Sequence, residues 1–354
     1  MKILVLTRYS KLGASSRFRF FQFFPYLQKN GCELTIKPLL GDNYINYLYA
    51  KTPTPFIEII NSYFNRVAIL LKKNDFELIW LQQEAFPWIP SWFEKILTRS
   101  NIPIVLDYDD AFFHRYDLNN SSFVRLVLGK KIDSVMNYAN VVVAGNNYLA
   151  ERAVRSGCKD VRILPTVVDL NKYPVVDQFE RADFTIGWIG SPHTAKYLEL
   201  INETLKALSL EKDVRIMVVG AGDFNPSGVK IEKIDWKEAT ESDEIQKFDV
   251  GLMPLIDSPW ERGKCGFKLI QYMASQKPVI ASPVGVNKEI VKQAQNGFLA
   301  ENNDDWIEYL IILKNDFDQR KKMGLAGRRL VEEKYSLQVT VPRLLNIFKE
   351  LIKK

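Results

Sequence analysis

Lysines and glycines lie close together in the stretch Arg262 to Lys268, which reads RGKCGFK. Lys264 and Lys268 supply positive charge, and Gly266 allows a ligand to approach the main chain closely. Apolar residues follow with helical spacing as far as Ala274, so Gly266 should stand at the start of a helix. The amides at a helix start attract anions. The stretch therefore predicts a phosphate site, with a plain turn as the alternative.

Buried strands are predicted on both sides of this stretch. The apolar run 248–254 leads into the loop 255–266, and a second apolar run, 279–282, follows the helix. The unit is thus strand, loop, helix, strand, which gives two parallel strands joined by a crossover helix. Ligands of open α/β sheets bind at the loops that follow the strands. The loop 8–16, which follows the first strand of the chain, is expected to be such a loop.

The same alternation runs through the rest of the chain and restarts once. Further predicted strands are residues 2–7, 32–38, 78–81, 104–106, 141–144, 184–189, 214–219 and 231–236. Predicted helices are residues 17–27, 43–73, 123–138, 195–208, 304–315, 318–334 and 339–354. The repeated pattern predicts an α/β protein with two doubly wound, Rossmann-like domains that face a cleft.

Size and composition fit two domains of ordinary size. The chain has 354 residues, of which 47% are hydrophobic and 25% charged, and its formal net charge is +6. No apolar run approaches the ~20 residues that span a bilayer, and residues 2–7 are too short for a signal peptide, so a cytoplasmic location is expected. Three distant cysteines indicate neither a disulfide framework nor a zinc site. Dispersed basic residues without a recognition motif predict no nucleic-acid partner.

Several segments resemble family 4 (group 1) glycosyltransferases of the GT-B fold, and in particular the branch of bacterial surface-polysaccharide synthesis. They are SSRFR at 15–19, DYDD at 107–110, GWIGSP at 187–192, the block 248–286 and NGFLA at 296–300. The resemblance implies that a first domain, residues 1–175, binds the acceptor. A second domain, 176–336, binds the nucleotide sugar, and a final helix, 337–354, crosses back to the first domain.

The resemblance also implies a reaction. A sugar passes from a nucleotide-diphosphate sugar to a glycan or lipid-linked acceptor, with retention of the anomeric configuration and without a metal or cofactor. Negative charge grows on the departing diphosphate, so the protein must hold positive charge and N–H dipoles against it.

The chain departs from the family pattern at two places. The family has two glutamates around the helix start, whereas here Gln271 takes the place of the second and the first falls near Gly263. An arginine and a lysine are common just after the strand 184–189, but here that place reads Ser191 to Thr194. The missing charge must therefore come from elsewhere.

The candidates to supply it are Lys264 and Lys268, with support from Arg262. Lys268 could instead belong to a solvated helix face, and Arg262 could form a surface pair with the adjacent Glu261. His114, the third catalytic candidate, resembles in position a family histidine near the transferred sugar.

Candidate substrate-binding residues follow predicted strands in both halves. In the first half they are Gly13, Arg17, Glu84, Asp109 and Asp110; in the second they are Gly190, Ser191, His193, Gly222, Trp236, Gly266, Phe267 and Gln271. Arg17 and Glu84 are assigned to the acceptor, His193 to the donor phosphate, and Trp236 to the nucleobase. The alternatives are ordinary ones: packing for Trp236, a turn for His193, a loop charge for Glu84, and a helix cap or a Mg²⁺ site for the aspartates.

Two other functions remain open from the sequence. A nucleotide-sugar epimerase or hydrolase on the same fold would turn over donor without an acceptor. A non-catalytic nucleotide-sugar-binding homologue would bind nucleotide without turnover. Peripheral attachment to the inner face of the membrane is also predicted, through Lys11, Arg17, Arg19 and Lys29 around an aromatic helix.

Overall fold

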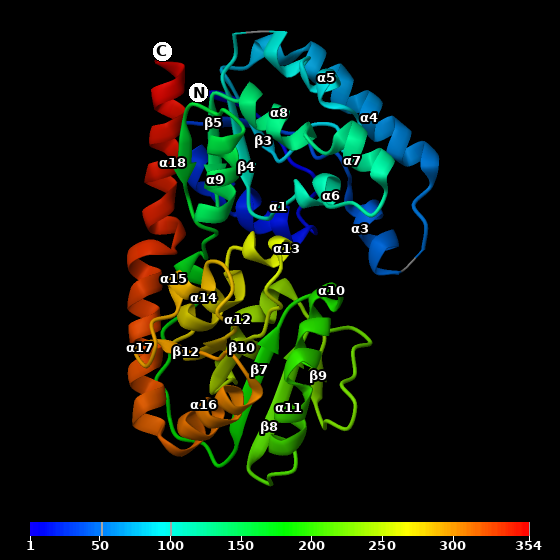
Figure 1. Ribbon diagram of the computed structural model, residues 1–354. Coiled ribbons are helices and arrows are strands. Elements are labelled where there is room, and N and C mark those ends of the chain that lie inside the picture. The colour runs from blue at the N-terminus through cyan, green and yellow to red at the C-terminus, as the bar shows by residue number, and fades with distance from the viewer. Residues whose placement is uncertain (51, 100, 354) are drawn as a thin grey trace. The chain divides into compact units, whose positions relative to one another are not determined.

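The computed structural model describes residues 1–50, 52–99 and 101–353, and the chain divides into two compact units. The first unit comprises Met1–Thr166, Gly263–Cys265 and Thr340–Lys354; the second comprises Val167–Arg262 and Gly266–Val339. Each unit contains its own parallel sheet (Figure 1). The division falls earlier in the chain than the predicted boundary at residue 175, and the acceptor and donor roles of the two domains stay predictions.

The first unit, within the described residues, has a six-stranded parallel sheet in the order β2-β1-β3-β4-β5-β6. Its strands are β1 Lys2–Leu6, β2 Glu33–Ile36, β3 Leu78–Gln82, β4 Ile104–Tyr108, β5 Val141–Ala144 and β6 Val161–Ile163. Its helices are α1 Ala14–Arg19, α2 Phe24–Lys29, α3 Asp42–Tyr49, α4 Phe56–Leu71, α5 Ser91–Glu94, α6 His114–Asp117, α7 Ser122–Leu128, α8 Lys131–Tyr138 and α9 Asn147–Arg155. Short 3₁₀ turns η1 Phe21–Phe23, η2 Lys73–Asp75 and η3 Leu97–Arg99 link some of them.

The second unit also has a six-stranded parallel sheet in its described part, in the order β12-β11-β10-β7-β8-β9. Its strands are β7 Phe184–Ile189, β8 Val214–Val219, β9 Glu232–Ile234, β10 Val250–Met253, β11 Val279–Ala281 and β12 Gly297–Leu299. Its helices are α10 Pro192–Ala195, α11 Asn202–Leu208, α12 Glu241–Gln246, α13 Pro259–Arg262, α14 Phe267–Ala274, α15 Asn287–Ile290, α16 Asn303–Asn315 and α17 Phe317–Lys334, with 3₁₀ turns η4 Leu170–Lys172, η5 Lys196–Ile201 and η6 Glu238–Thr240. The two parallel sheets confirm the predicted α/β class of two Rossmann-like domains.

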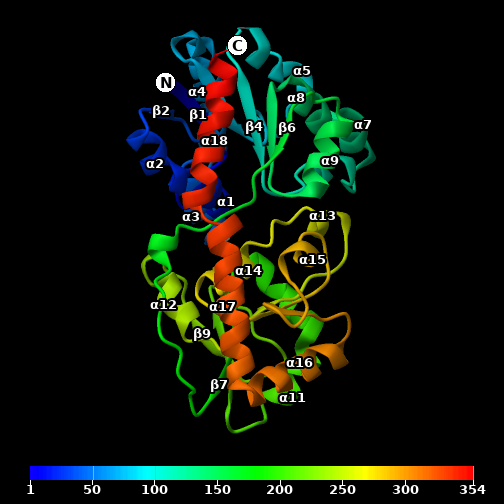
Figure 2. The ribbon, with the colours of Figure 1, turned by 90° about the vertical axis from the view of Figure 1, so that its left-hand side faces the viewer.

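The last helix, α18 Leu337–Ile352, returns to the first unit, as predicted. Its Phe348 is fully buried, with its ring centroid 5.4 Å from that of Trp80 in the middle of β3. Figure 2 shows α18 lying along the sheet of the first unit. A buried aromatic pair of this kind contributes about 1 kcal/mol beyond its buried area, so the end of the chain is firmly held.

Several predicted helices are divided in the structure. Residues 43–73 form α3 and α4 rather than one helix, because Pro53 and Pro55 lie between them and proline disfavours helix in the residue before it. Residues 17–27 form α1, η1 and α2, and Pro25 stands in the first turn of α2, where its missing N–H costs nothing. Likewise, residues 123–138 divide into α7 and α8.

Two further differences concern strands. Asp107 and Tyr108 belong to β4 itself, whereas the sequence placed them in the loop that follows. The short edge strands β6 and β12 were not predicted, because three residues are too few to show a pattern.

Helices α14 and α17 pack closely because α17 carries glycine at the contact. A Cβ atom at Gly324 would lie 2.0 Å from the main-chain oxygen of Gln276. In an open helix, alanine is more stable than glycine by about 1 kcal/mol. Here we expect the opposite sign: Gly324→Ala should lower the free energy of unfolding by about 1–3 kcal/mol, because the main chain must move apart.

Urea unfolding followed by circular dichroism measures this difference. Lys322→Ala, at an exposed position of the same helix, is the matched control and should change the midpoint little. A Gly324→Ala protein as stable as the unmodified chain would show that the contact is not tight.

Candidate active site

The strand order of the second sheet creates a gap in the cover of its carboxyl edge. Successive strands β7, β8 and β9 run outwards to one side, and β10, β11 and β12 run outwards from β7 to the other. Loops that follow β7 and β10 therefore leave the sheet in opposite directions, and ligands of such sheets bind at this switch point. The predicted residues Gly190, Ser191 and His193 follow β7 directly.

Three main-chain segments meet at glycines on this edge. A Cβ atom at Gly190 would lie 2.8 Å from Lys268 Cε and 2.5 Å from Trp188 Cη2. A Cβ atom at Gly220, which has a φ of +78°, would lie 2.3 Å from the Gly190 carbonyl oxygen. Only glycine fits either place. The structure thus brings Lys268 of α14 to the end of β7.

Lys268 is half-buried, and its Nζ lies 5.3 Å from the centroid of the Trp188 ring. The ammonium group is therefore held over an aromatic face on β7, a contact of about 0.5–1 kcal/mol when exposed. This position differs from the solvated helix face that was the alternative for Lys268. It places a cation at the switch point in the region from which the family's arginine and lysine are missing.

The rest of the β7 and β8 edge is built from short, tight turns. Ser191 caps α10 together with Thr194, whose hydroxyl accepts from the Ser191 amide at 3.2 Å. Gly222 has a φ of +60° and packs against Pro192. His193 is exposed on α10, in the same turn. These predicted residues therefore lie together at one edge of the second unit.

Gly266 begins α14, as predicted, with a left-handed φ of +66°. The space beside it is occupied: a Cβ atom there would lie 2.4 Å from Cδ1 of Ile290. Gly266 is thus required by the packing of the protein itself, and close approach of a ligand is not needed to explain it. Phe267, the first helical residue, is half-buried against the core.

Gln271 and Trp236 both bind the same carboxylate, which sequence reasoning missed. Glu241 Oε1 accepts from Gln271 Nε2 at 2.8 Å and from the Tyr173 hydroxyl at 2.7 Å, and Glu241 Oε2 accepts from Trp236 Nε1 at 2.7 Å. Gln271 is 4% exposed and Glu241 9%. The position where the family has a glutamate thus carries an amide that donates to a glutamate from α12. Nothing in the local sequence around Glu241 distinguishes it from the other acids of that stretch.

The carboxyl edge of the first sheet carries a second polar cluster. Ser15 of α1 donates to Asp109 and accepts from Gln82 Nε2 at 2.8 Å. Gln83, with a left-handed φ of +61°, donates to Asp109 Oδ1 at 3.3 Å. Helix α1, the end of β3 and the loop after β4 therefore meet around Asp109, beside the switch point between β1 and β3. Gly13 caps the same helix α1 and packs against Tyr9.

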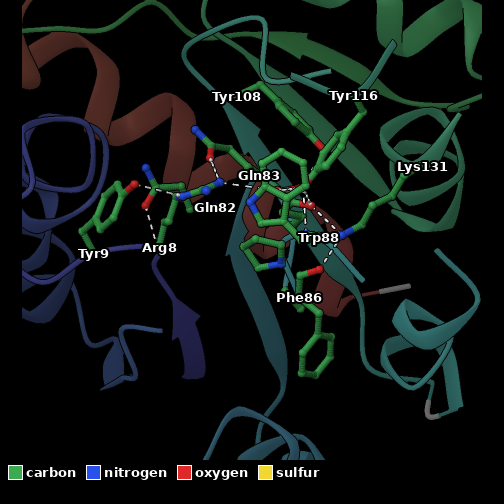
Figure 3. A network of polar contacts seen from close by, with 12 residues as sticks. Arg8, Tyr9, Gln82, Gln83, Phe86, Trp88, Tyr108, Tyr116 and Lys131 are labelled. Carbon is green, nitrogen blue, oxygen red and sulfur yellow. Dashed lines mark hydrogen bonds and ion pairs between the residues drawn. The ribbon is translucent and has the colours of Figure 1, made fainter. Parts of the chain in front are cut away.

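Glu84 lies below this edge in a buried network and is not an ordinary loop charge. It is 3% exposed, and its carboxylate contacts Lys131 Nζ at 2.6 Å, the Tyr116 hydroxyl at 2.8 Å and Arg8 Nη1 at 3.4 Å. These three partners, Arg8, Tyr116 and Lys131, are labelled in the network that Figure 3 shows. A buried ion pair is costly to break, so Glu84 is better suited to fixing the loop after β3 than to exchanging protons with a substrate.

Lys264 falls in the first unit, apart from Gly266 in the division of the chain. Its Nζ lies 3.9 Å from Asp110 Oδ1, and its carbonyl accepts from Asn146 Nδ2 at 3.0 Å. Cys265 beside it is buried, and burial raises the pKa of its thiol well above the usual range. This agrees with a filler rather than a nucleophile.

Three candidates are engaged away from these clusters. Arg262 forms two hydrogen bonds with the Asp257 carboxylate, at 2.6 and 3.1 Å, and both side chains are about half exposed. The predicted surface pair of Arg262 is therefore present, but its partner is Asp257 and not Glu261. His114 Nδ1 lies 2.8 Å from Asp117 Oδ1, and His114 Nε2 lies 2.8 Å from the Tyr148 hydroxyl. Both ring nitrogens thus have protein partners. Arg17 is 6% exposed, with Nη1 3.4 Å from the Leu12 carbonyl.

The predicted membrane contact through Arg17 and Arg19 is wrong. Both side chains are buried, at 6% and 3% exposed, and Arg19 forms an ion pair with Asp107 inside the first unit. Neither guanidinium can meet a lipid headgroup. The aromatic residues of this segment are core, since Phe20, Phe23 and Phe24 are buried against Trp80.

The Gln271–Glu241 contact makes a prediction that runs against the family pattern. Gln271→Glu, which restores the family residue, should destabilise the second unit at neutral pH, because it sets two buried carboxylates against each other. We expect a loss of about 2 kcal/mol or more, with partial recovery at low pH as one carboxyl protonates. Differential scanning calorimetry between pH 5 and 8 measures it.

The exchanged pair Gln271→Glu with Glu241→Gln is the control, and it should recover most of the lost stability. If Gln271→Glu alone is as stable as the unmodified chain at neutral pH, Gln271 and Glu241 are not in the described contact.

Known proteins resemble this chain both in sequence and in structure. Residues 183–316 match the family model described as Glycosyl transferases group 1. An uncharacterized glycosyltransferase of Methanocaldococcus jannaschii, MJ1069, is 22% identical over 326 residues, which cover 84% of this chain and 81% of the relative. Sucrose-phosphate synthase of Thermosynechococcus elongatus superposes with a TM-score of 0.76 at 13% identity, covering 100% of this chain and 99% of that structure.

HepE of Anabaena, in complex with UDP, superposes with a TM-score of 0.72 at 13% identity, over 99% of this chain and 100% of that structure. At such identities the structures establish the fold, which is that of the GT-B glycosyltransferases. The matched residues 183–316 include β7, α14 and the whole β7–β10 switch point. Residues 183–316, in the second unit, are therefore similar to group 1 glycosyltransferases, and the chain has the GT-B fold.

Proposed function

We propose that the chain is a retaining glycosyltransferase of family 4, which moves a sugar from a nucleotide-diphosphate sugar to a glycan or lipid-linked acceptor. We place the reaction in cell-surface polysaccharide synthesis, on the cytoplasmic side of the membrane, and propose that it needs neither metal nor cofactor. The observation that carries the proposal is Lys268 beside Gly190, at the switch point of the sheet within the matched residues.

Lys268 is the better placed of the two lysines to meet a departing diphosphate. Its ammonium lies over Trp188 at the end of β7, the site that this topology offers to a ligand. Lys264 instead lies 3.9 Å from Asp110 in the first unit. A preorganised cation stabilises the transition state most when charge develops next to it, because the surrounding dipoles need not reorient. We therefore assign the main charge-stabilising role to Lys268 and a supporting role to Lys264.

The nucleoside is proposed to lie along the β8 and β9 end of the same edge. Gly220 and Gly222 follow β8, and Trp236, which follows β9, is fixed by its hydrogen bond to Glu241. HepE, the fold neighbour, was solved with UDP and with UDP-glucose. Uridine diphosphate sugars are therefore the first donors to test. The acceptor is proposed to bind the first unit near Asp109 and Gln83, at the other switch point.

The assignment of Lys268 predicts a specific kinetic effect. Lys268→Ala should lower kcat by on the order of 10²-fold, since one preorganised charge-stabilising group is lost, and should raise KM for the donor much less. Lys264→Ala should cost less than Lys268→Ala. Initial rates of nucleoside diphosphate release with UDP-glucose or another accepted donor give both numbers.

Lys322→Ala, an exposed lysine on α17, is the control for the general loss of a positive charge. If Lys268→Ala leaves kcat normal, Lys268 does not stabilise the transition state and only packs against Trp188. In that case His193 would be the next residue to test.

Independence from metal predicts that activity survives EDTA. Within the described ranges, no group of three His, Cys, Asp or Glu side chains is arranged to hold a metal ion, and Asp107 already pairs with Arg19. Transfer rates should be equal with excess EDTA and with added Mg²⁺. Loss of activity on chelation that Mg²⁺ or Mn²⁺ restores would overturn this part of the proposal.

A thermal-shift screen against UDP, GDP and their sugars, followed by product analysis, tests the proposal as a whole. A ligand that binds only the folded chain raises its melting temperature. Transfer of the sugar to an acceptor with retained configuration supports the enzyme. Donor turnover without an acceptor would indicate a hydrolase or epimerase, and binding without turnover would indicate a non-catalytic homologue.

A further inference from the structure

Helix α4 exposes large apolar side chains, three of them in a row along one face and Phe56 at the start of the helix. Phe56, Ile57, Phe64 and Leu71 are 75%, 61%, 69% and 68% exposed. Ile57, Phe64 and Leu71 are spaced by seven residues, close to two helical turns, so they form a straight row about 21 Å long. A single exposed apolar residue is ordinary, but a row of this kind marks a contact surface.

The opposite face of α4 fixes the helix to the first unit. Arg66 is 3% exposed, and its Nη2 donates to the carbonyls of Thr7 at 2.9 Å and Lys37 at 3.0 Å. Leu70 is 1% exposed, and the Tyr63 hydroxyl donates to the Pro87 carbonyl at 2.7 Å. Core packing and hydrogen bonds thus hold the inner face of α4 on the first unit. The outer row therefore has no place in the core of its own unit.

Cations border this row. Lys72, the residue after α4, is exposed. Lys73 donates to the Leu97 carbonyl at 2.9 Å, so the end of α4 lies beside the segment that follows α5. On α5 and just after it, Trp92 is 65% exposed and Lys95 is exposed. The one acidic residue of α4, Glu58, is half-buried and lines a pocket with Asp42 and Ser62.

We propose that this surface, the α4 face, docks on a lipid bilayer that carries anionic headgroups. The α4 face consists of Phe56, Ile57, Phe64, Leu71, Lys72, Trp92 and Lys95. A helix that lies in the plane of the bilayer buries its apolar row at the edge of the acyl chains, while tryptophan and lysine sit among the headgroups. Each lysine near an anionic surface adds electrostatic attraction that salt screens.

A bilayer fits the α4 face better than a second copy of the chain. In a symmetric pair each face meets itself, so the lysines at one end would come close to lysines or to the apolar row. Among the described residues, no helix is long and apolar enough to cross a membrane, and α4 extends only about 24 Å. Contact at the surface is the mode that its length allows.

The docking inference deepens the proposed function by choosing a lipid-linked acceptor, and only that choice rests on the proposed function. Docking itself is measured without donor or acceptor. A chain that binds vesicles but transfers no sugar would leave the α4 face standing and overturn the enzyme. A chain that transfers sugar but binds no vesicles would do the reverse.

Co-sedimentation of the full chain with vesicles of phosphatidylethanolamine and phosphatidylglycerol tests the α4 face. Phe56→Ser together with Phe64→Ser should lower the partition coefficient by about tenfold or more, because two inserted aromatic side chains are removed. Phe179→Ser is the matched control, since Phe179 of the second unit is also 75% exposed. Melting temperatures should be equal, because all three side chains are exposed.

Lys72→Gln with Lys95→Gln separates the two contributions. This pair should weaken binding to the anionic vesicles at low salt by about tenfold and leave binding to phosphatidylcholine vesicles unchanged. Failure of the unmodified chain to bind the anionic vesicles would overturn the inference, as would equal binding by the Phe56/Phe64 variant. Sedimentation velocity that showed a dimer, broken by the same variant, would assign the face to a second copy.

Discussion

The reversal of strand order between β7 and β10 is the constraint on which the second unit depends. Because β10 pairs with β7 on the side away from β8, the connections on either side of β7 leave the sheet in opposite directions. The carboxyl end of β7 therefore lies at a switch point, where ligands of such sheets bind. Close packing then fills this edge: Gly190 accepts Lys268 and Trp188 against its main chain, and no larger residue fits. Topology thus determines where the switch point lies, and glycine allows Lys268 to approach the end of β7 closely.

Elements with a strong local pattern could be predicted from the sequence. The buried strands around residues 184–189, 214–219 and 250–253 are continuous apolar runs, and α14 shows both a glycine start and an apolar stripe. The restart of the βα pattern predicted two domains. The prediction of one helix failed where proline intervened. Pro53 and Pro55 separate α3 from α4, although the segments on both sides have a helical composition.

Side-chain partners could not be predicted, because they come from distant parts of the chain. Glu84 was interpreted as a loop charge or an acceptor ligand, but its partners Arg8 and Lys131 are remote in sequence and reach it only when β1, β3 and α8 assemble. Arg19 was placed at a membrane, yet Asp107 of β4 pairs with it in the core. Glu241 was not singled out at all, because its role depends on Tyr173, Trp236 and Gln271 arriving from three other segments.

The departures from the family pattern are connected by this geometry. An amide at Gln271 is what a neighbouring glutamate requires, since two buried carboxylates at 2.8 Å would repel. In this chain the buried carboxylate belongs to Glu241 of α12, and its oxygens accept hydrogen bonds from Gln271, Tyr173 and Trp236. In the same way, a lysine on α14 brings positive charge to the end of β7, whose own loop carries Ser191 and His193 instead.

Hydrogen–deuterium exchange of the full chain, with and without a saturating nucleoside diphosphate sugar, tests the proposed donor site most directly. Ligand at the β7–β10 switch point should slow exchange of the amides of residues 190–194, 220–223 and 266–269, all in the second unit. The remainder of that unit should change little. Protection confined to the first unit, or absent from those three segments while the ligand is bound, would contradict the assignment of the donor site.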